Sequence, residues 1–287
     1  MHLVQAKGLL SAQNGMNIYR GCTHGCIYCD SRSACYGMGH PFEDVAAKAN
    51  APALLEAALR RKKERCMIGT GAMSDPYWPG EQTLCLTRRC LERIERHGFG
   101  LSILTKSTGI LRDADLLGQI NRNAKCVAQM TLTTFDDALC RRLEPNVAPT
   151  RERAEALCAL GELGIPTIVW LTPILPYIND TPENIRGILR LCKEAGVKGV
   201  LCFGMGLTLR EGNRAYFYAQ LDRLFPGLSA RYSRRFGAAY GCLSENHPAL
   251  TGLFHAECQR LGLWHDNDAI FAFLRAFTER DEQLKMW

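Results

Sequence analysis

The chain has 287 residues, of which 47% are apolar and 22% charged, and 35 Lys and Arg against 29 Asp and Glu give it a formal net charge of +6. This composition is too apolar for a disordered chain and too charged for a bundle of membrane helices. No apolar run reaches the roughly 18 residues of a spanning helix and no secretory signal is apparent, so we expect a cytoplasmic protein without a membrane partner.

Short apolar segments alternate along the chain with amphipathic segments of helical period, a pattern typical of buried parallel strands and their connecting helices. Thr181 before a proline indicates the start of one helix, and Gly164 and Gly196 stand where glycine commonly follows a helix end. The expected strands are 16–20, which is the weakest, 67–71, 101–105, 127–132, 167–172 and 200–203, and the expected helices are 52–65, 81–97, 114–121, 151–163 and 182–195.

Six strand–helix units in succession predict part of a β/α barrel. A complete barrel of eight units needs about 250 residues, whereas the alternating pattern ends near residue 210. We therefore expect an α/β fold in which residues 1–211 form a partial (β/α)6 TIM-type barrel. Residues 212–287 are expected to form a helical C-terminal extension packed on this core, with helices at 213–224, 248–261 and 268–279.

The fourteen cysteines are too sparse for a disulfide scaffold, and most stand singly in apolar segments, where a thiol behaves as a small buried hydrophobe. Cys22, Cys26 and Cys29 differ, because they lie within eight residues directly after the first expected strand. Loops that follow barrel strands lie at the face where active sites form. The three thiols therefore predict a metal centre at that face.

The kind of metal centre is open on spacing alone. Structural zinc usually takes four ligands in two pairs, and the sequence has no second Cys-x2-Cys pair, although His24 or Cys35 could supply a fourth ligand. Ferredoxin-type clusters also take four cysteines. A non-catalytic zinc or iron–sulfur binding module therefore stands as the alternative to an enzyme.

The spacing Cys-x3-Cys-x2-Cys, with Tyr28 before the last cysteine, resembles the signature of radical S-adenosylmethionine (SAM) enzymes. The resemblance implies a [4Fe–4S] cluster held by Cys22, Cys26 and Cys29, whose fourth iron binds the amino and carboxylate groups of SAM. It also implies one-electron reduction by a flavodoxin- or ferredoxin-type partner, which cleaves SAM to a 5′-deoxyadenosyl radical that takes a hydrogen atom from a substrate. The substrate is not named by the sequence.

Further motifs stand at 17–22, 74–77 with Pro79 and Glu81, 105–107, 143–145, 173–176 and 179–180. Together they resemble the spore photoproduct lyase-like family, the relatives of DNA repair photolyases. Two positions depart from the lyases themselves: Ala72 stands where they carry a hydrogen-donating cysteine, and Asp30 where they carry a tyrosine. We therefore do not expect thymine-dimer repair.

The resemblance implies roles in SAM binding for residues after each of the first three expected strands. Tyr28 is expected to pack near the adenine, unless it is an ordinary buried tyrosine. Ser74 is expected at the methionine amino group or in a turn, and Asp75 is either a second acceptor or the turn residue before proline. Lys106 ends an apolar strand, where an ammonium needs an anionic partner. The resemblance implies that this partner is the SAM carboxylate.

Three threonines, Thr131, Thr133 and Thr134, follow one another at the end of the fourth strand. We expect one of them, taken as Thr133, to face SAM, although β propensity alone also accounts for threonines there. Glu144 and Arg153 are expected to form a structural pair between the following loop and helix.

The C-terminal extension offers a candidate nucleic-acid surface and a candidate catalytic thiol. Cys242 could quench a radical or be an ordinary buried cysteine. Arginines that alternate with aromatic residues suit phosphate contacts and base stacking, although a solvated helix face has the same pattern. These residues are Arg231, Tyr232, Arg234, Arg235 and Phe236.

Overall fold

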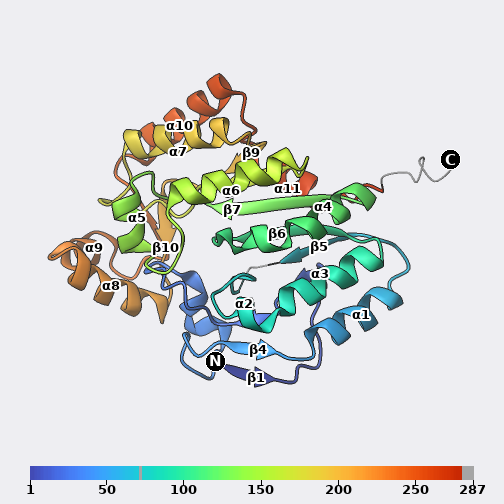
Figure 1. Cartoon of the computed structure of the whole chain (residues 1–287). Helices are drawn as coiled ribbons and strands as arrows, with labels where there is room; N and C mark the ends of the chain where they lie inside the picture. The colour runs from blue at the N-terminus through green and yellow to red at the C-terminus, as the bar shows by residue number, and fades with distance from the viewer. Residues whose placement is uncertain (71–72, 280–287) are drawn as a thin grey trace.

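The computed structural model describes residues 1–70 and 73–279, and a six-stranded sheet lies at its centre (Figure 1). Every pair of neighbouring strands in this sheet is parallel. The expected partial barrel is therefore confirmed. In spatial order the strands are β2 (Gly15–Met16), β5 (Met67–Thr70), β6 (Gly100–Thr105), β7 (Cys126–Thr131), β8 (Thr167–Trp170) and β9 (Gly199–Leu201).

Helices cover the outer side of this sheet (Figure 1). The Thr181 hydroxyl accepts a hydrogen bond from the backbone N–H of Asn184 and so caps the last of these helices, as expected. The single helix expected at 81–97 is divided at Cys85, whose φ of 49° places it in the left-handed region. The helices are α1 (Ala51–Arg61), α2 (Glu81–Leu84), α3 (Leu86–Arg96), α4 (Ala114–Asn123), α5 (Asp137–Leu143), α6 (Thr150–Glu162) and α7 (Pro182–Glu194).

A small second sheet, which the sequence did not predict, lies beside the barrel. It contains β1 (His2–Val4), β4 (Ala46–Lys48) and β3 (Tyr19–Arg20) in that order. The strand expected at 16–20 is therefore wrong as one element, because its residues are shared between β2 of the barrel and β3 of this sheet. Strands of two or three residues are too short for an alternating pattern to reveal.

The C-terminal extension is mostly helical, as expected, and contains α8 (Asn213–Leu224), α9 (Leu228–Phe236), α10 (His247–Leu261) and α11 (Asn267–Arg275). It also supplies a short strand, β11 (Gly241–Leu243), which pairs antiparallel with β10 (Gly206–Thr208). The division of the chain at residues 211–212 stays a prediction. Within the described residues, no helix is long and apolar enough to cross a membrane.

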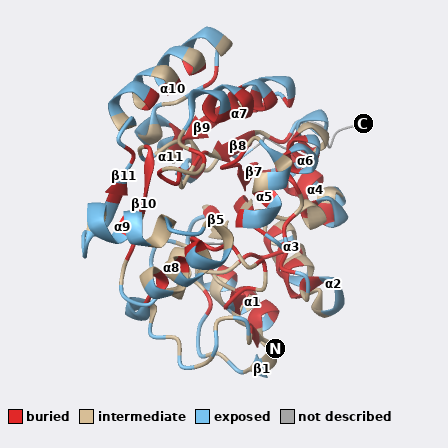
Figure 2. Cartoon of the chain, turned by 90° about the vertical axis from the view of Figure 1, so that its left-hand side faces the viewer, coloured by how far each residue is buried: buried red, intermediate tan, exposed pale blue. Residues whose placement is uncertain are grey.

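Helix α11 packs against the inner face of the barrel strands. Alternate strand residues belong to different apolar clusters: Ile68 and Val169 face the outer helices, whereas Met67 and Ile168 pack with Ile270 of α11. Buried residues are accordingly concentrated in the strands and in the helix faces turned toward them (Figure 2). The C-terminal helix thus fills part of the barrel interior and leaves the opposite end of the barrel open.

Candidate functional site

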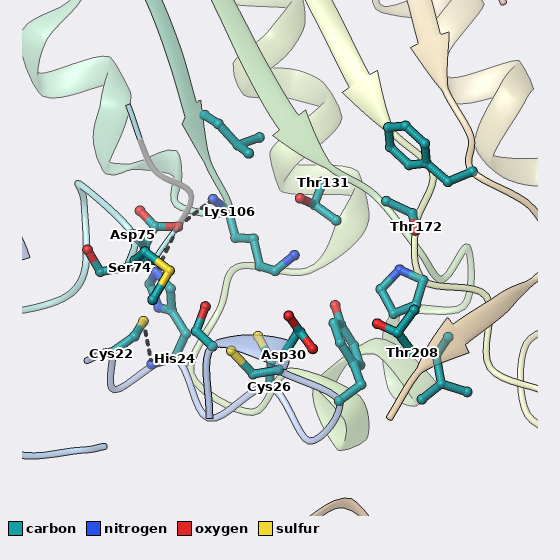
Figure 3. A pocket seen from close by; sticks show the side chains of 18 of the residues that line it. Cys22, His24, Cys26, Asp30, Ser74, Asp75, Lys106, Thr131, Thr172 and Thr208 are labelled. Atoms are coloured by element: carbon teal, nitrogen blue, oxygen red, sulfur yellow. Dashed lines mark hydrogen bonds and ion pairs between the residues drawn. The ribbon is translucent and has the colours of Figure 1, made fainter. Parts of the chain in front are cut away.

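A cavity of about 390 Å³ lies at the carboxyl ends of the barrel strands. One or more side chains after each of five strands line it, beginning with Ser74 after β5 and Lys106 after β6, and Figure 3 shows Ser74, Lys106, Thr131 and Thr172 around this wall. Thr131 ends β7, Thr172 follows β8 and Phe203 follows β9. This end of a β/α barrel is where catalytic and binding side chains gather.

The cysteine loop forms another wall of the same cavity, and Cys22, Cys26 and Cys29 all line it. Glycine allows the loop to turn there, because Gly21 has a φ of 91° and a Cβ at this position would collide with the carbonyl oxygen of Phe42. Gly25 has a φ of 74°, also in the left-handed region. The three predicted ligands therefore face one space.

The properties of the three thiols suit ligands of an iron–sulfur cluster better than reactive, nucleophilic cysteines. Burial, together with the nearby Asp75 carboxylate, raises the pKa of the Cys22 thiol to about 12, and burial also raises the pKa of Cys26 and of Cys29. A metal deprotonates the thiols that bind it. No three His, Cys, Asp or Glu side chains of the described residues are placed for one shared ion. In a [4Fe–4S] cluster each iron takes its own thiolate, so the thiols need not meet at a point.

The two residues considered as a fourth zinc ligand are differently placed. The His24 ring lies between two acceptors, with Nδ1 3.2 Å from the backbone oxygen of Asn146 and Nε2 3.3 Å from Asp75 Oδ2. Cys35 is exposed, does not line the cavity, and has its sulfur 3.4 Å from Nη1 of Arg210.

Asp75 joins the cysteine loop to the end of β6. Its carboxylate accepts hydrogen bonds from the backbone N–H of Lys106 at 2.7 Å and from the Thr105 hydroxyl at 2.5 Å, and it also contacts His24. Although burial opposes ionisation, His24 and these donors hold the pKa of Asp75 below its usual value. Ser74 lines the cavity and donates its hydroxyl hydrogen to the backbone oxygen of Tyr19. Asp75 thus has protein donors on both oxygens, which supports a positioning role.

Lys106 has the anionic partner that the sequence required, and it is Glu144. The ammonium lies 3.5 Å from Glu144 Oε1 and 5.6 Å from the centre of the Tyr28 ring, and its side chain is 18% exposed. Glu144 is fully buried and pairs with Arg153 at 2.5 Å, which confirms the expected structural pair. Burial opposes ionisation of Glu144, but Arg153 and Lys106 lower its pKa to about 2.

Two predicted site residues do not reach the cavity. Thr133 is fully buried, its backbone oxygen accepts the side-chain amide of Asn179, and Thr131 lines the wall instead. In β11 the neighbours of Cys242, Gly241 and Leu243, line the cavity, so the buried Cys242 faces the opposite side of that strand. The position of the departure at Ala72 lies outside the described residues.

The prediction that Tyr232 stacks on a base of a bound nucleic acid is wrong. This side chain is fully buried and donates its hydroxyl hydrogen to the backbone oxygen of Pro176, so it is not free to stack on a base. The Arg231 guanidinium lies 3.6 Å from the centre of the Tyr177 ring.

The sequence missed Phe203 and Leu243 as cavity residues. Phe203 lines the cavity while 52% exposed and lies in a group of aromatic rings with Trp170 and Phe271. Its place at the end of an expected strand was the only signal available for it.

The sequence profile described as the Radical SAM superfamily matches residues 16–192, which include the cysteine loop and strands β5 to β8. The chain belongs to the radical SAM superfamily. The match covers more than half of the chain and includes the barrel up to α7. The family carries a [4Fe–4S] cluster and SAM as its cofactors, and the thiol set described above fits the cluster.

The chain is similar in sequence to individual relatives and similar in fold to solved structures. An uncharacterized protein of Mycobacterium tuberculosis is 31% identical over 223 residues, and the alignment covers 76% of this chain and 65% of the length of that relative. A Pseudomonas phage M6 protein named Radical SAM Nalpha-GlyT isomerase is 21% identical over 215 residues, 75% of this chain and 43% of its own length. A spore photoproduct lyase structure has a TM-score of 0.67 at 13% identity and covers 92% of this chain and 80% of that chain.

Proposed function

We propose that this protein is a radical SAM enzyme that holds a [4Fe–4S] cluster through Cys22, Cys26 and Cys29 and binds SAM beside it. The observation that carries the proposal is that three thiols of one loop line the same cavity as Ser74 and Lys106 at the carboxyl ends of the barrel strands. The cofactors, when bound, supply one-electron reductive cleavage of SAM to methionine and a 5′-deoxyadenosyl radical, which removes a hydrogen atom from the substrate.

The chain's own residues would bind and orient SAM. Lys106 has three N–H donors and would bind the carboxylate, and Ser74 would accept a hydrogen bond from the amino group. Tyr28 is almost fully buried beside the cluster loop and would exclude water from it. The electron would come from a flavodoxin- or ferredoxin-type protein. A cytoplasmic location suits this chemistry, since all fourteen cysteines, each within the described residues, are free thiols.

For the substrate we propose only a candidate class. Nucleic acid stays a candidate, supported by exposed guanidinium groups on α9, those of Arg231, Arg234 and Arg235. Authentic spore photoproduct lyase activity is not proposed, because Asp30 stands where those enzymes carry a tyrosine. A non-catalytic iron–sulfur or zinc module is the rival, and the polar side chains that line the cavity after several strands favour the enzyme.

The experiment is anaerobic reconstitution of the wild type and two matched cysteine variants, followed by iron, sulfide and zinc analysis. We expect about four irons per wild-type chain and loss of the cluster in Cys26→Ala, because the cluster then lacks one of three ligands. Cys35→Ala should keep its iron, since this thiol lies outside the cavity. Stoichiometric zinc without iron uptake, or equal loss of iron in both variants, would contradict the three-thiolate site.

A further inference from the structure

A buried ion pair behind the cavity wall contacts several of the residues assigned to SAM. Glu144 follows α5, Arg153 lies in α6, and neither side chain has any exposed surface or lines the cavity. A buried pair of this kind is weak evidence for stability, because an apolar pair of similar volume often does as well. Its contacts therefore have to explain what it does.

Each charged group of the pair holds a residue of the cavity wall. Oε1 of Glu144 accepts the hydroxyl hydrogen of Tyr28 and lies 3.5 Å from the Lys106 ammonium. Oε2 accepts from Nη2 of Arg153, whose Nη1 donates to the backbone oxygen of Thr131 at 2.7 Å. Tyr28, Lys106 and Thr131 all line the cavity, and they come from the cysteine loop, the end of β6 and the end of β7.

The charges of this group also suit an incoming carboxylate. Lys106 alone would be neutralised by Glu144, whereas Arg153 adds a second positive charge and leaves the three side chains with a net charge of +1. A lysine ammonium has three donors, so it can keep its contact with Glu144 while it binds another acceptor. Lysine has a long flexible stem, and a fixed ammonium loses less conformational freedom when a ligand binds.

We propose that the Glu144–Arg153 pair is a positioning unit that fixes the Lys106 ammonium for the carboxylate of SAM. The inference rests on the proposed function, since it takes Lys106 as a SAM-binding residue. Glu144 and Arg153 act through Lys106 and do not themselves touch SAM.

The test is a double-mutant cycle on the affinity for SAM, measured by equilibrium dialysis with unreduced, cluster-loaded protein. Lys106→Met should weaken SAM binding about tenfold, or about 1.4 kcal/mol. Glu144→Gln should weaken it by a similar factor in the wild-type background, because a neutral amide has one acceptor oxygen where the carboxylate has two and so cannot hold both the Lys106 ammonium and the Arg153 guanidinium. In the Lys106→Met background Glu144→Gln should cause no further loss, and iron content should be unchanged throughout.

A second variant covers the case in which Glu144→Gln does not fold, since it leaves the buried Arg153 cation without its partner. Glu144→Gln combined with Arg153→Met removes both charges, and it should show the same loss of SAM affinity. Asp113→Asn is the matched control: Asp113 is also a fully buried carboxylate paired with arginines, but it does not line the cavity. Its affinity for SAM should equal that of the wild type.

The outcomes separate the inference from the proposed function. If Lys106→Met weakens binding and neither Glu144→Gln nor the charge-free double variant does, the positioning role is refuted while the role of Lys106 stands. Equal losses from Glu144→Gln in both backgrounds would also refute it, because the carboxylate would then act independently of Lys106. An unchanged affinity for SAM in Lys106→Met would overturn both the positioning role of the ion pair and the assignment of Lys106 as a SAM-binding residue.

Discussion

Arg32 links the segment after the cluster loop to helix α8, and its removal is expected to destabilise the protein. Its guanidinium carbon lies 4.3 Å from the centre of the Phe42 ring and 3.8 Å from that of Tyr216, and the side chain is 8% exposed. Two desolvated cation–π contacts contribute about 1 kcal/mol each. The buried stem adds about 1 kcal/mol, and the pair with the half-exposed Glu43 adds little. We expect Arg32→Ala to lower the free energy of unfolding by about 3 kcal/mol.

The assay is urea unfolding of the cluster-free protein with reduced thiols, followed by circular dichroism and linear extrapolation. Arg32→Lys should lose about half as much, because an ammonium keeps the charge without the planar stacking of a guanidinium. The control is Arg60→Ala, which removes an exposed arginine that pairs with Glu56 and should change stability by less than about 0.5 kcal/mol. A loss below about 1 kcal/mol in Arg32→Ala, or no difference between the alanine and lysine variants, would show that the stacking of Arg32 between Phe42 and Tyr216 does not stabilise the protein.

Two further predictions use the same assay. Leu274→Ala should cost about 2–5 kcal/mol, because this buried side chain of α11 packs on the inner face of the barrel and its loss leaves a cavity there; a loss below about 1 kcal/mol would mean that α11 does not fill the barrel. The pKa of Glu144 is about 2 in the folded protein, below the value of about 4.3 for an unperturbed glutamate, so its contribution to stability is complete above about pH 5 and is lost as the pH falls toward 2. The difference in unfolding free energy between the wild type and Glu144→Gln should therefore shrink on acidification, and a difference that is constant or grows would contradict the buried charge.

Much of the barrel follows from patterns that the sequence displays directly. The barrel strands β5 to β9 were found because each belongs to a short apolar run, and that pattern arises when both faces of a parallel strand are buried. The cysteine loop and Lys106 were found because thiols and an ammonium at the ends of such strands have few structural explanations. Glu144 was correctly paired with Arg153, but its contact with Lys106 joins residues far apart in the chain and left no local signal.

The errors arise where tertiary packing decides which way a side chain points. A strand continued to residue 133 would place Thr131 and Thr133 on the same face, but β7 ends at Thr131, so the alternation does not reach Thr133 and only Thr131 lines the cavity. Cys242 lies in a strand of three residues, which is too short for the sequence to show that its side chain faces away from the cavity. Tyr232 is interleaved with arginines in the sequence, and its burial depends on Tyr177 and Phe217, whose rings it packs against.

The central claim is that the three-cysteine loop and the cavity beside it carry out SAM cleavage. The most direct measurement is the release of 5′-deoxyadenosine from SAM by the cluster-loaded protein under anaerobic conditions, with dithionite as the electron donor. The account predicts 5′-deoxyadenosine from the wild type and from Cys35→Ala, and none from Cys26→Ala. Iron-loaded wild-type protein that binds SAM but releases no 5′-deoxyadenosine on reduction would contradict it.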